Sequence, residues 1–113
     1  MEVGIDLVEF IEVENRDERF IKRILSEKEY LVYQEFKIQK RKTEYLASRF
    51  ASKEAIFKAF KKGDLSLNFN DISILNDECN APYIVIRNEI MNNLKISISH
   101  SKNYAVAIVI KED

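Results

Sequence analysis

A segment of helical length near the middle of the sequence constrains the fold most, because its apolar side chains surround the whole helix axis. At about 100° per residue, the aromatic and aliphatic residues between 45 and 60 point in almost every direction. We expect a helix that starts near Thr43 and ends before Gly63, with Lys61 and Lys62 in its last turn and Gly63 as its C-terminal cap. Such a helix must be enclosed by the rest of the chain.

Two charged residues on this helix need an explanation. Glu54 and Lys58 lie one turn apart, beside Ala47 and Ala51, whose short side chains should leave open space next to the charges. Moving each charge into a protein interior costs several kcal/mol unless a partner compensates. A Glu–Lys pair at this spacing on an exposed face is also a common helix stabiliser, worth about 0.3–0.5 kcal/mol. The helix alone therefore leaves a structural and a functional interpretation of Glu54 open.

Length and composition limit the class of protein. A chain of 113 residues predicts a single domain, residues 1–113, whose small core would gain from burial at an oligomer interface. The net charge of −1 argues against a dedicated nucleic-acid binder. One cysteine, Cys79, excludes an internal disulfide and a cysteine metal cluster. Because the chain has no signal-peptide pattern and no run of about 20 apolar residues, we expect a cytoplasmic protein.

Strands and further helices are expected on both sides of the central helix. The expected elements are a strand over 3–8, an amphipathic helix over 16–25, a helix opened by the capping-box sequence 26–29, strands over 65–69, 72–75 and 83–86, a short helix over 88–94, and strands over 96–99 and 104–110. Helices and strands are mixed without regular βαβ alternation. The sequence therefore predicts an α+β fold with a mainly antiparallel sheet packed on the long central helix.

Few polar residues stand out as candidates for chemistry. Asp6 is unusual between Ile5 and Leu7 in a strand, although a strand-end Asp can also cap a turn. With two glycines in the chain, glycine-rich phosphate loops are excluded, and with one histidine and one cysteine a zinc site is excluded. Asp6 and Glu54 suit a hard ion such as Mg²⁺, which usually completes its shell with water and substrate phosphates.

Three segments together closely resemble the small class of 4′-phosphopantetheinyl transferases, the holo-acyl-carrier-protein synthases. They are Gly-Ile-Asp-Leu-Val-Glu at 4–9, Arg-Phe-Ala-Ser-Lys-Glu-Ala-Ile-Phe-Lys-Ala-Phe at 49–60, and the stretch 96–107 that contains Ser-His-Ser. Weaker matches lie between them, so the resemblance covers nearly the whole chain. It implies transfer of 4′-phosphopantetheine from coenzyme A to a serine of an apo-acyl carrier protein, with Mg²⁺, release of adenosine 3′,5′-bisphosphate and a place in fatty acid biosynthesis.

The resemblance also implies residue roles. Asp6 and Glu54 would hold Mg²⁺, and Lys58 would contact phosphate. The set implied for coenzyme A is Arg49, Lys58, His100 and Ser101. The carrier serine needs a base to take its proton, for which Glu54 is the first candidate and Lys58 the second. His100 and Ser101 could instead be ordinary turn residues.

Partners follow from the same resemblance. Members of this size are trimers with active sites between subunits, so we expect a homotrimer. An acidic carrier protein would meet the basic face formed by Arg16, Arg19, Lys22 and Arg23. Two residues depart from the family pattern. Glu12 stands where a basic residue that helps to hold the carrier is usual, and Lys61-Lys62 stand where a glycine is usual, in the loop that shapes the adenine end of the coenzyme A site.

Two other functions remain open on the residues alone. A two-carboxylate nuclease or phosphatase would hydrolyse phosphodiesters without a carrier, but few further acids lie near the two motifs. A non-catalytic binding or oligomerising module would use Glu54 and Lys58 as a structural pair.

Overall fold

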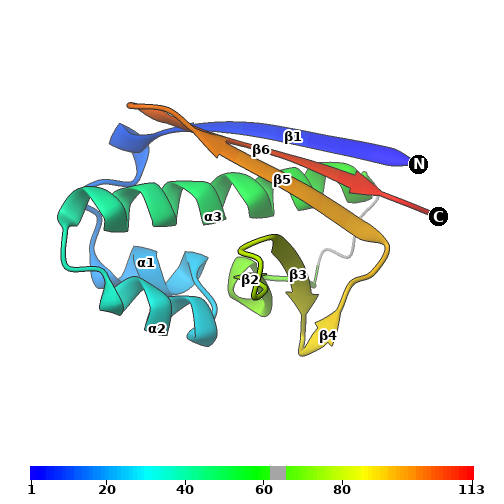
Figure 1. Ribbon diagram of the computed structural model, residues 1–113, viewed down its shortest axis with the longest axis horizontal. Helices are drawn as coiled ribbons and strands as arrows, with labels where there is room; N and C mark the ends of the chain where they lie inside the picture. Colours follow the sequence, from blue (N-terminus) through cyan, green and yellow to red (C-terminus); the bar gives the residue numbers. More distant parts are fainter. Residues whose placement is uncertain (62–65) are drawn as a thin grey trace.

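The computed structural model describes residues 1–61 and 66–113 (Figure 1). Its elements are, in chain order, β1 (Glu2–Glu9), the 3-10 turn η1 (Phe10–Glu12), α1 (Glu18–Ile24), α2 (Glu27–Glu35), α3 (Gln39–Phe60), the 3-10 turn η2 (Phe69–Asp71), β2 (Ile72–Asn76), β3 (Pro82–Ile86), β4 (Glu89–Ile90), β5 (Leu94–His100) and β6 (Tyr104–Lys111). None of the described helices is long and apolar enough to cross a membrane.

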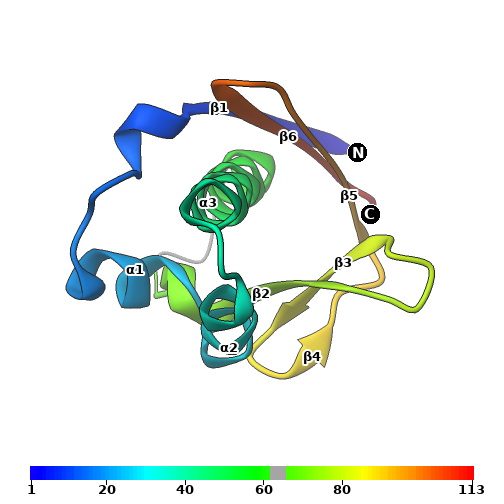
Figure 2. The ribbon, with the colours of Figure 1, turned by 60° about the vertical axis from the view of Figure 1, so that its left-hand side comes forward.

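The strands form two antiparallel sheets on opposite sides of α3. One sheet has the order β1-β6-β5, and the other has the order β2-β3-β4. Figure 2, seen nearly along α3, shows the helix inside a ring made by the first sheet, α1, α2 and the second sheet. The predicted α+β fold with antiparallel strands on a long central helix is confirmed. The predicted enclosure of the helix is confirmed as well, since Ala55, Ile56 and Ala59 are fully buried.

The first strand packs against α3 through its small residues. A Cβ on Gly4 would lie 1.9 Å from the carbonyl oxygen of Ala55 and 2.8 Å from the amide nitrogen of Ala59, so only glycine fits here. Ala47 and Ala51 are also completely buried. The expectation of open space beside these alanines is therefore wrong. Their short side chains instead allow the sheet to pack close to α3.

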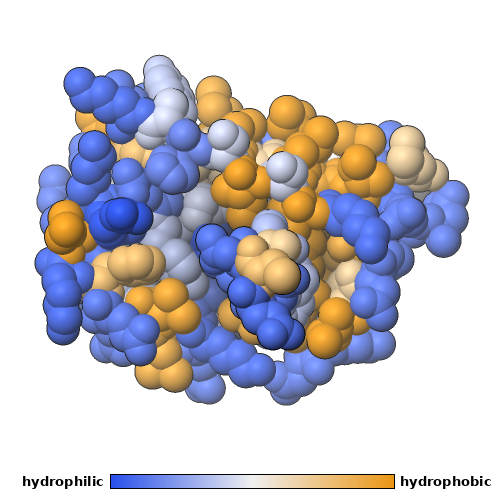
Figure 3. Space-filling model, viewed as in Figure 1, coloured by the Kyte–Doolittle hydropathy of each residue, from blue (hydrophilic) through white to orange (hydrophobic). Residues whose placement is uncertain are grey.

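The strand register decides which way Asp6 points. Side chains alternate along β1, so Asp6 shares the helix-facing side with Gly4. The opposite side is apolar and exposed. This outer sheet face consists of Val3, Ile5 and Leu7 on β1 and their partners Ile110, Ile108 and Val106 on β6, with Tyr104 at the end. Figure 3 shows hydrophobic side chains gathered over the part of the surface where this sheet lies.

The ends of α3 differ from the expectation. The helix begins at Gln39 rather than near Thr43, and it ends at Phe60. Lys61 follows the last helical residue and has a φ of 49°. It is therefore the C-terminal cap residue, a position that we expected Gly63 to occupy. The expected roles of Lys62 and Gly63 fall outside the described residues.

Two other expected elements are wrong. The segment 88–94 contains strand β4 rather than a helix, because Arg87 and Asn88 have φ values of 50° and 69° and form a two-residue hairpin loop between β3 and β4. The strand expected over 65–69 is also wrong where it is described. Phe69 begins the 3-10 turn η2, and Leu67 is in no strand; Leu65 lies outside the described residues.

The remaining elements follow the prediction closely. The capping box at the start of α2 is present, with the amide of Glu29 donating to Ser26 Oγ at 3.2 Å and the amide of Ser26 donating to Glu29 Oε1 at 2.9 Å. Pro82 is the first residue of β3, as expected for a residue without an N–H. The helix expected over 16–25 is shorter, and Asp17 caps it.

Candidate active site

Asp6 and Lys58 meet between β1 and α3. The Nζ of Lys58 donates to Asp6 Oδ1 at 2.9 Å and to the carbonyl oxygen of Ile5 at 3.0 Å. The Asp6 side chain is 18% exposed and the Lys58 side chain 54% exposed, so the pair lies at the edge of the contact between strand and helix. This pairing explains how a strand can carry an aspartate on its helix-facing side.

Glu54 lies one helical turn before Lys58 and belongs to the same cluster. Partial burial raises the pKa of the Glu54 carboxyl above its ordinary value, and the negative charge of Asp6 raises this pKa further. The ammonium of Lys58 acts in the opposite direction, and Glu12 adds a smaller repulsion. The three residues expected from the sequence to share a site therefore influence one another in the folded chain.

The cluster fits a hard divalent cation. Asp6 and Glu54 offer carboxylate oxygens, and their mutual repulsion would be relieved by a cation between them. Within residues 1–61 and 66–113, no three His, Cys, Asp or Glu side chains gather into a ready-made metal cluster. Two protein carboxylates suit Mg²⁺, which keeps waters and takes further oxygens from substrate phosphates.

His100 and Ser101 lie elsewhere on the sheet. Asp6 pairs with Ala107, which in turn pairs with Ile98, whereas His100 pairs with Ala105 further along β6. His100 therefore lies two residues after Ile98 on β5, and β6 separates β5 from β1, the strand that carries Asp6. Both residues border a cavity of about 420 Å³ together with Leu7, Ser99, Tyr104 and Val106, most of which belong to the outer sheet face. Leu7, Tyr104 and Val106 in this lining belong to the outer sheet face, whereas the Asp6–Lys58 pair lies between β1 and α3.

Arg49 is buried on the side of α3 that faces β2. Its Nη2 donates to the carbonyl oxygen of Ile74 at 3.1 Å, and its Nη1 donates to Ser48 Oγ at 3.2 Å. The guanidinium also stacks on the ring of Tyr45 at 4.2 Å. The Nε of Arg49 has no hydrogen-bond partner among the described residues. A contact of Arg49 with coenzyme A stays a prediction.

The basic face expected on α1 is exposed. Arg16, Arg19, Lys22 and Arg23 are all solvent-accessible. Arg16 stacks on Phe20 at 3.7 Å and donates from Nη1 to the carbonyl oxygen of Glu12. Arg23 borders the same cavity as Glu54, so the basic face reaches the candidate site.

The two departures from the family pattern have local partners. The Glu12 carboxylate accepts a hydrogen bond from the Glu9 amide at 2.8 Å and so caps the turn η1 after β1. The Nζ of Lys61 lies 2.7 Å from Glu2 Oε2 on β1. Both side chains thus have a structural role close to the strand that carries Asp6.

Sequence reasoning missed a buried ion pair beside Glu54. Lys53 and Glu29 are both fully buried, and the Lys53 ammonium donates to Glu29 Oε1 and, at 2.7 Å, to the carbonyl oxygen of Ile24. Glu29 Oε2 also accepts from the amide of Ile74 at 2.8 Å. Burial lowers the pKa of Lys53, and Glu29 opposes that effect. The pair therefore fixes α3 against α1, α2 and β2.

A signal for Lys53 was present in the helical pattern. Leu46, Phe50, Lys53 and Phe57 follow one another at helical spacing, so the lysine occupies an apolar position of the stripe. A lysine in such a position needs a buried acid as its partner. The capping box identified Glu29 only as a local cap.

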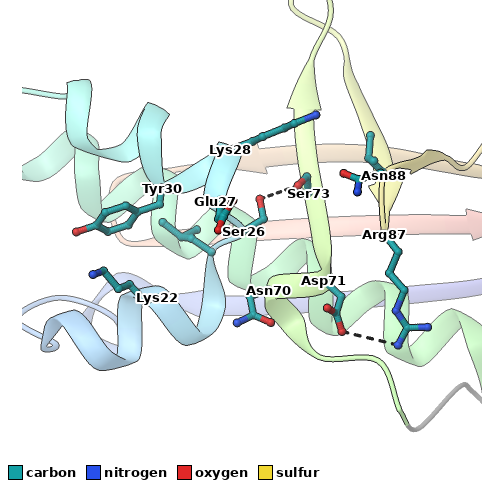
Figure 4. A pocket seen from close by; sticks show the side chains of 12 residues that line it. Lys22, Ser26, Glu27, Lys28, Tyr30, Asn70, Asp71, Ser73, Arg87 and Asn88 are labelled. Carbon is teal, nitrogen blue, oxygen red and sulfur yellow. Dashed lines mark hydrogen bonds and ion pairs between the residues drawn. The ribbon is translucent and has the colours of Figure 1, made fainter.

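Another cavity lies away from the Asp6–Lys58 pair. It has a volume of about 740 Å³ and lies between α1, the start of α2 and the β3–β4 hairpin. Figure 4 shows its side chains, with the Ser26–Ser73 hydrogen bond on the α2 side and the Asp71–Arg87 ion pair on the hairpin side. Asp6, Glu54 and Lys58 do not line it.

The chain is similar to known proteins over nearly its whole length. The chain is 42% identical to a holo-[acyl-carrier-protein] synthase of Acholeplasma laidlawii over 111 residues, covering 97% of this chain and 94% of the relative. It is 45% identical to the synthase of Oceanobacillus iheyensis, with the same coverage.

Solved structures are similar over nearly the whole chain. A holo-(acyl-carrier-protein) synthase from Bacillus anthracis, in complex with CoA (3′,5′-ADP), has a TM-score of 0.84 and 36% identity, covering 99% of this chain and 96% of the other. The Helicobacter pylori synthase in complex with coenzyme A has a TM-score of 0.78 and 33% identity, covering 97% of this chain and 99% of the other. Residues 2–109 match the family described as the 4′-phosphopantetheinyl transferase superfamily. The chain therefore belongs to the 4′-phosphopantetheinyl transferase superfamily.

Proposed function

We propose that this protein transfers 4′-phosphopantetheine from coenzyme A to a serine of apo-acyl carrier protein and releases adenosine 3′,5′-bisphosphate. The transfer would serve fatty acid biosynthesis in the cytoplasm. The observation that carries the proposal is the cluster of Asp6, Glu54 and Lys58, in which Lys58 Nζ lies 2.9 Å from Asp6 Oδ1 and Glu54 is one turn away. The family and the coenzyme A complexes of similar proteins support it.

Asp6 and Glu54 are proposed to hold Mg²⁺. When bound there, the metal would polarise the pyrophosphate and offset the charge that develops on its oxygens. The Lys58 side chain is 54% exposed, so its ammonium can turn from Asp6 toward a phosphate oxygen. Its positive charge would then stabilise the transition state, in which phosphoryl oxygens carry most of the charge.

Glu54 is the first candidate for the base that takes the proton from the carrier serine. The raised pKa of its carboxyl makes it a stronger base than an exposed glutamate, while the positive charge of Lys58 limits the rise and favours the ionised form. Lys58 is the second candidate, and it would have to lose its proton first. Arg49, His100 and Ser101 are proposed to bind coenzyme A.

We propose a homotrimer whose subunits meet through the outer sheet face. Val3, Ile5 and Leu7 on this face are between 46% and 59% exposed, which is unusual for three aliphatic side chains in one strand. Contact through this face would let the cavity that contains His100 and Ser101 complete the site of a neighbouring subunit. The arrangement accounts for the separation of His100 from Asp6 within one chain.

The basic face of Arg16, Arg19, Lys22 and Arg23 is proposed to dock the acidic carrier protein. Because Arg23 borders the cavity that Glu54 lines, docking there would bring the carrier serine toward the candidate base. Exposed charges of this kind mainly increase the rate of association between the two proteins, and this effect weakens as the salt concentration rises.

The experiment that tests the function is mass spectrometry of an apo-acyl carrier protein incubated with the chain, coenzyme A and Mg²⁺. We expect the carrier to gain the mass of one phosphopantetheine, with equimolar adenosine 3′,5′-bisphosphate in the supernatant, and no gain when EDTA removes the metal. A carrier whose mass stays unchanged with coenzyme A and Mg²⁺ present would contradict the proposal.

A further inference from the structure

A buried lysine lies next to the candidate base in the sequence, and the proposed reaction does not use it. Lys53 precedes Glu54 on α3, but its side chain is completely buried. The Lys53 ammonium donates to the carbonyl oxygen of Ile24 at 2.7 Å and to the Glu29 carboxylate. Ile24 is the last residue of α1, so its carbonyl has no partner within that helix. Lys53 therefore links the helix that carries Glu54 to the end of the helix that carries the basic face.

The Glu29 carboxylate keeps the Lys53 ammonium in place. Glu29 Oε1 also accepts from the Ser26 amide at 2.9 Å, and Oε2 accepts from the Ile74 amide at 2.8 Å. These two donors belong to the start of α2 and to β2. Both members of the ion pair are completely buried, so separating them would leave two buried charges without compensation. The ammonium therefore has a fixed position relative to α2 and β2.

Two contacts fix the direction of α1 relative to α3. In the first half of α1, the ring of Phe20 meets that of Phe50 edge to face, with ring centroids 6.0 Å apart. At the end of α1, the carbonyl oxygen of Ile24 is held by Lys53. Phe50 and Lys53 are three residues apart, so they lie on the same side of α3. One contact near each end of a short helix determines its orientation as well as its distance.

The second contact lies beside the two residues that the proposed reaction must bring together. Arg23 immediately precedes Ile24, and Glu54 immediately follows Lys53. Arg23 and Glu54 border the same cavity of about 450 Å³. The hydrogen bond from Lys53 to Ile24 therefore limits how far Arg23 can move from Glu54. Proton transfer to a base needs heavy atoms about 2.6–3.2 Å apart, and a displacement of about 1 Å can cost about 10² in rate.

We propose that Lys53 is a positioning residue, which holds α1 so that a carrier docked on the basic face presents its serine to Glu54. The proposal rests on the proposed function and adds a requirement to it. Lys53 touches neither substrate, because it acts through the carbonyl of Ile24. Loss of the lysine leaves all four charges of the basic face on α1. The carrier would then still dock, but its serine would be displaced from the base.

Three variants separate positioning from stability. Lys53→Met removes the donor to Ile24 and leaves Glu29 buried without its cation. The double variant, Lys53→Met with Glu29→Gln, removes both charges and should therefore be more stable than either single variant. Glu29→Gln alone removes the anion but keeps the lysine, which still donates to Ile24. Urea unfolding ranks the stabilities and shows that each variant is folded under the assay conditions.

Leu94→Ala is the control for lost stability alone. It shortens a buried side chain at the start of β5, and Figure 2 shows β5 on the opposite side of α3 from α1. The variant should lose stability, because it leaves a cavity in the core, but it should keep its rate of transfer.

We expect kcat for carrier modification to fall about 10–100-fold in Lys53→Met and equally in the double variant, despite the greater stability of the latter. Glu29→Gln should keep the kcat of the unmodified chain. The KM for the carrier should not change in any variant, because the basic face is intact. Binding of Mn²⁺ in the presence of coenzyme A should not change either, because Asp6 and Glu54 are intact.

The proposal is overturned if kcat recovers in the double variant together with stability, because transfer would then follow stability. It is also overturned if Glu29→Gln loses as much kcat as Lys53→Met, because the donor to Ile24 would then not matter. A raised KM for the carrier with an unchanged kcat would overturn it as well, since Lys53 would then affect docking and not alignment.

Hydrogen exchange of the α1 amides tests the same proposal without a carrier. These amides should exchange faster in the double variant than in Glu29→Gln, although the double variant is more stable overall, because only the double variant lacks the donor to Ile24. Equal or slower exchange in the double variant would overturn the proposal. If the unmodified chain modifies no carrier, the proposed function fails, whereas the exchange comparison decides separately whether Lys53 holds α1.

Discussion

Lys58 on α3 and Asp6 on β1 form an ion pair with 2.9 Å between Nζ and Oδ1, at the point where the first strand crosses the central helix. Gly4, two residues earlier in the same strand, sets the distance of this crossing, because any larger residue would collide with the backbone of Ala55. The acid and the lysine therefore have a fixed relation to Glu54, one turn away on α3.

Replacing Lys58 by alanine should reduce transfer strongly and stability little. A partly exposed ion pair contributes about 0–1 kcal/mol to folding, whereas loss of a positioned cation at a reacting phosphoryl group typically costs about 10²–10³ in rate. The comparison is kcat/KM for carrier modification together with the urea midpoint. Lys37→Ala, at an exposed lysine between α2 and α3, is the control and should transfer normally. Unimpaired transfer by Lys58→Ala would exclude a role for this lysine in the reaction.

Glu54→Gln should make the fold more stable at neutral pH. Burial and Asp6 raise the pKa of Glu54 above its ordinary 4.5, so the folded chain favours the protonated carboxyl. The stabilisation from this protonated form is complete below pH 4.5 and is lost as the pH rises through the raised pKa. A glutamine at this position cannot ionise, so the variant does not lose this stabilisation as the pH rises.

Urea midpoints of the two proteins should therefore nearly coincide in acid and separate in favour of Glu54→Gln toward pH 8. Glu35→Gln at the exposed end of α2 is the control and should follow the unmodified chain. A lower midpoint for Glu54→Gln at pH 8 would mean that attraction to Lys58 outweighs burial and repulsion.

Lys53→Ala should cost about 3–5 kcal/mol of folding free energy, because it leaves the fully buried Glu29 without its cation. The double variant Lys53→Met with Glu29→Gln removes both charges and keeps most of the volume, so it should recover much of that loss. Urea unfolding of the single and double variants provides the comparison. Equal losses in both would show that the volume and hydrogen bonds, rather than the charge, matter at this position.

Ile5→Lys should dissociate the proposed trimer, since it places a charge in the outer sheet face without touching α3. Sedimentation of the unmodified chain should give three times the monomer mass, and sedimentation of the variant a monomer. Val32→Lys, at an exposed apolar position on α2, is the matched control and should remain a trimer. A monomeric unmodified chain would contradict the oligomer and, with it, a site shared between subunits.

The sequence was sufficient to single out those residues of the candidate site that are unusual in their local context. An aspartate inside an apolar strand and a Glu–Lys pair on an enclosed helix are both exceptions to local preference, and such exceptions occur at functional sites. Their proximity could be anticipated only through the resemblance, because nothing in the local pattern indicates which strand covers which side of α3.

Other features could not be predicted from local patterns. The β3–β4 hairpin turns at Arg87-Asn88 without a glycine, so the usual signal for a two-residue loop was weak and the segment resembled a helix. The Lys53–Glu29 pair joins residues from separate helices, and the capping box already gave Glu29 a sufficient local role. Arg49 lies at a helix position whose environment depends on where β2 packs.

The claim that Asp6 and Glu54 hold one divalent cation is tested most directly by binding of Mn²⁺, which replaces Mg²⁺ in oxygen sites and can be followed by electron paramagnetic resonance. With coenzyme A present, we expect one bound Mn²⁺ per chain in the unmodified protein. Binding should be lost in Asp6→Asn and in Glu54→Gln, although both variants fold. Undiminished Mn²⁺ binding by either variant would show that the two carboxylates do not share an ion.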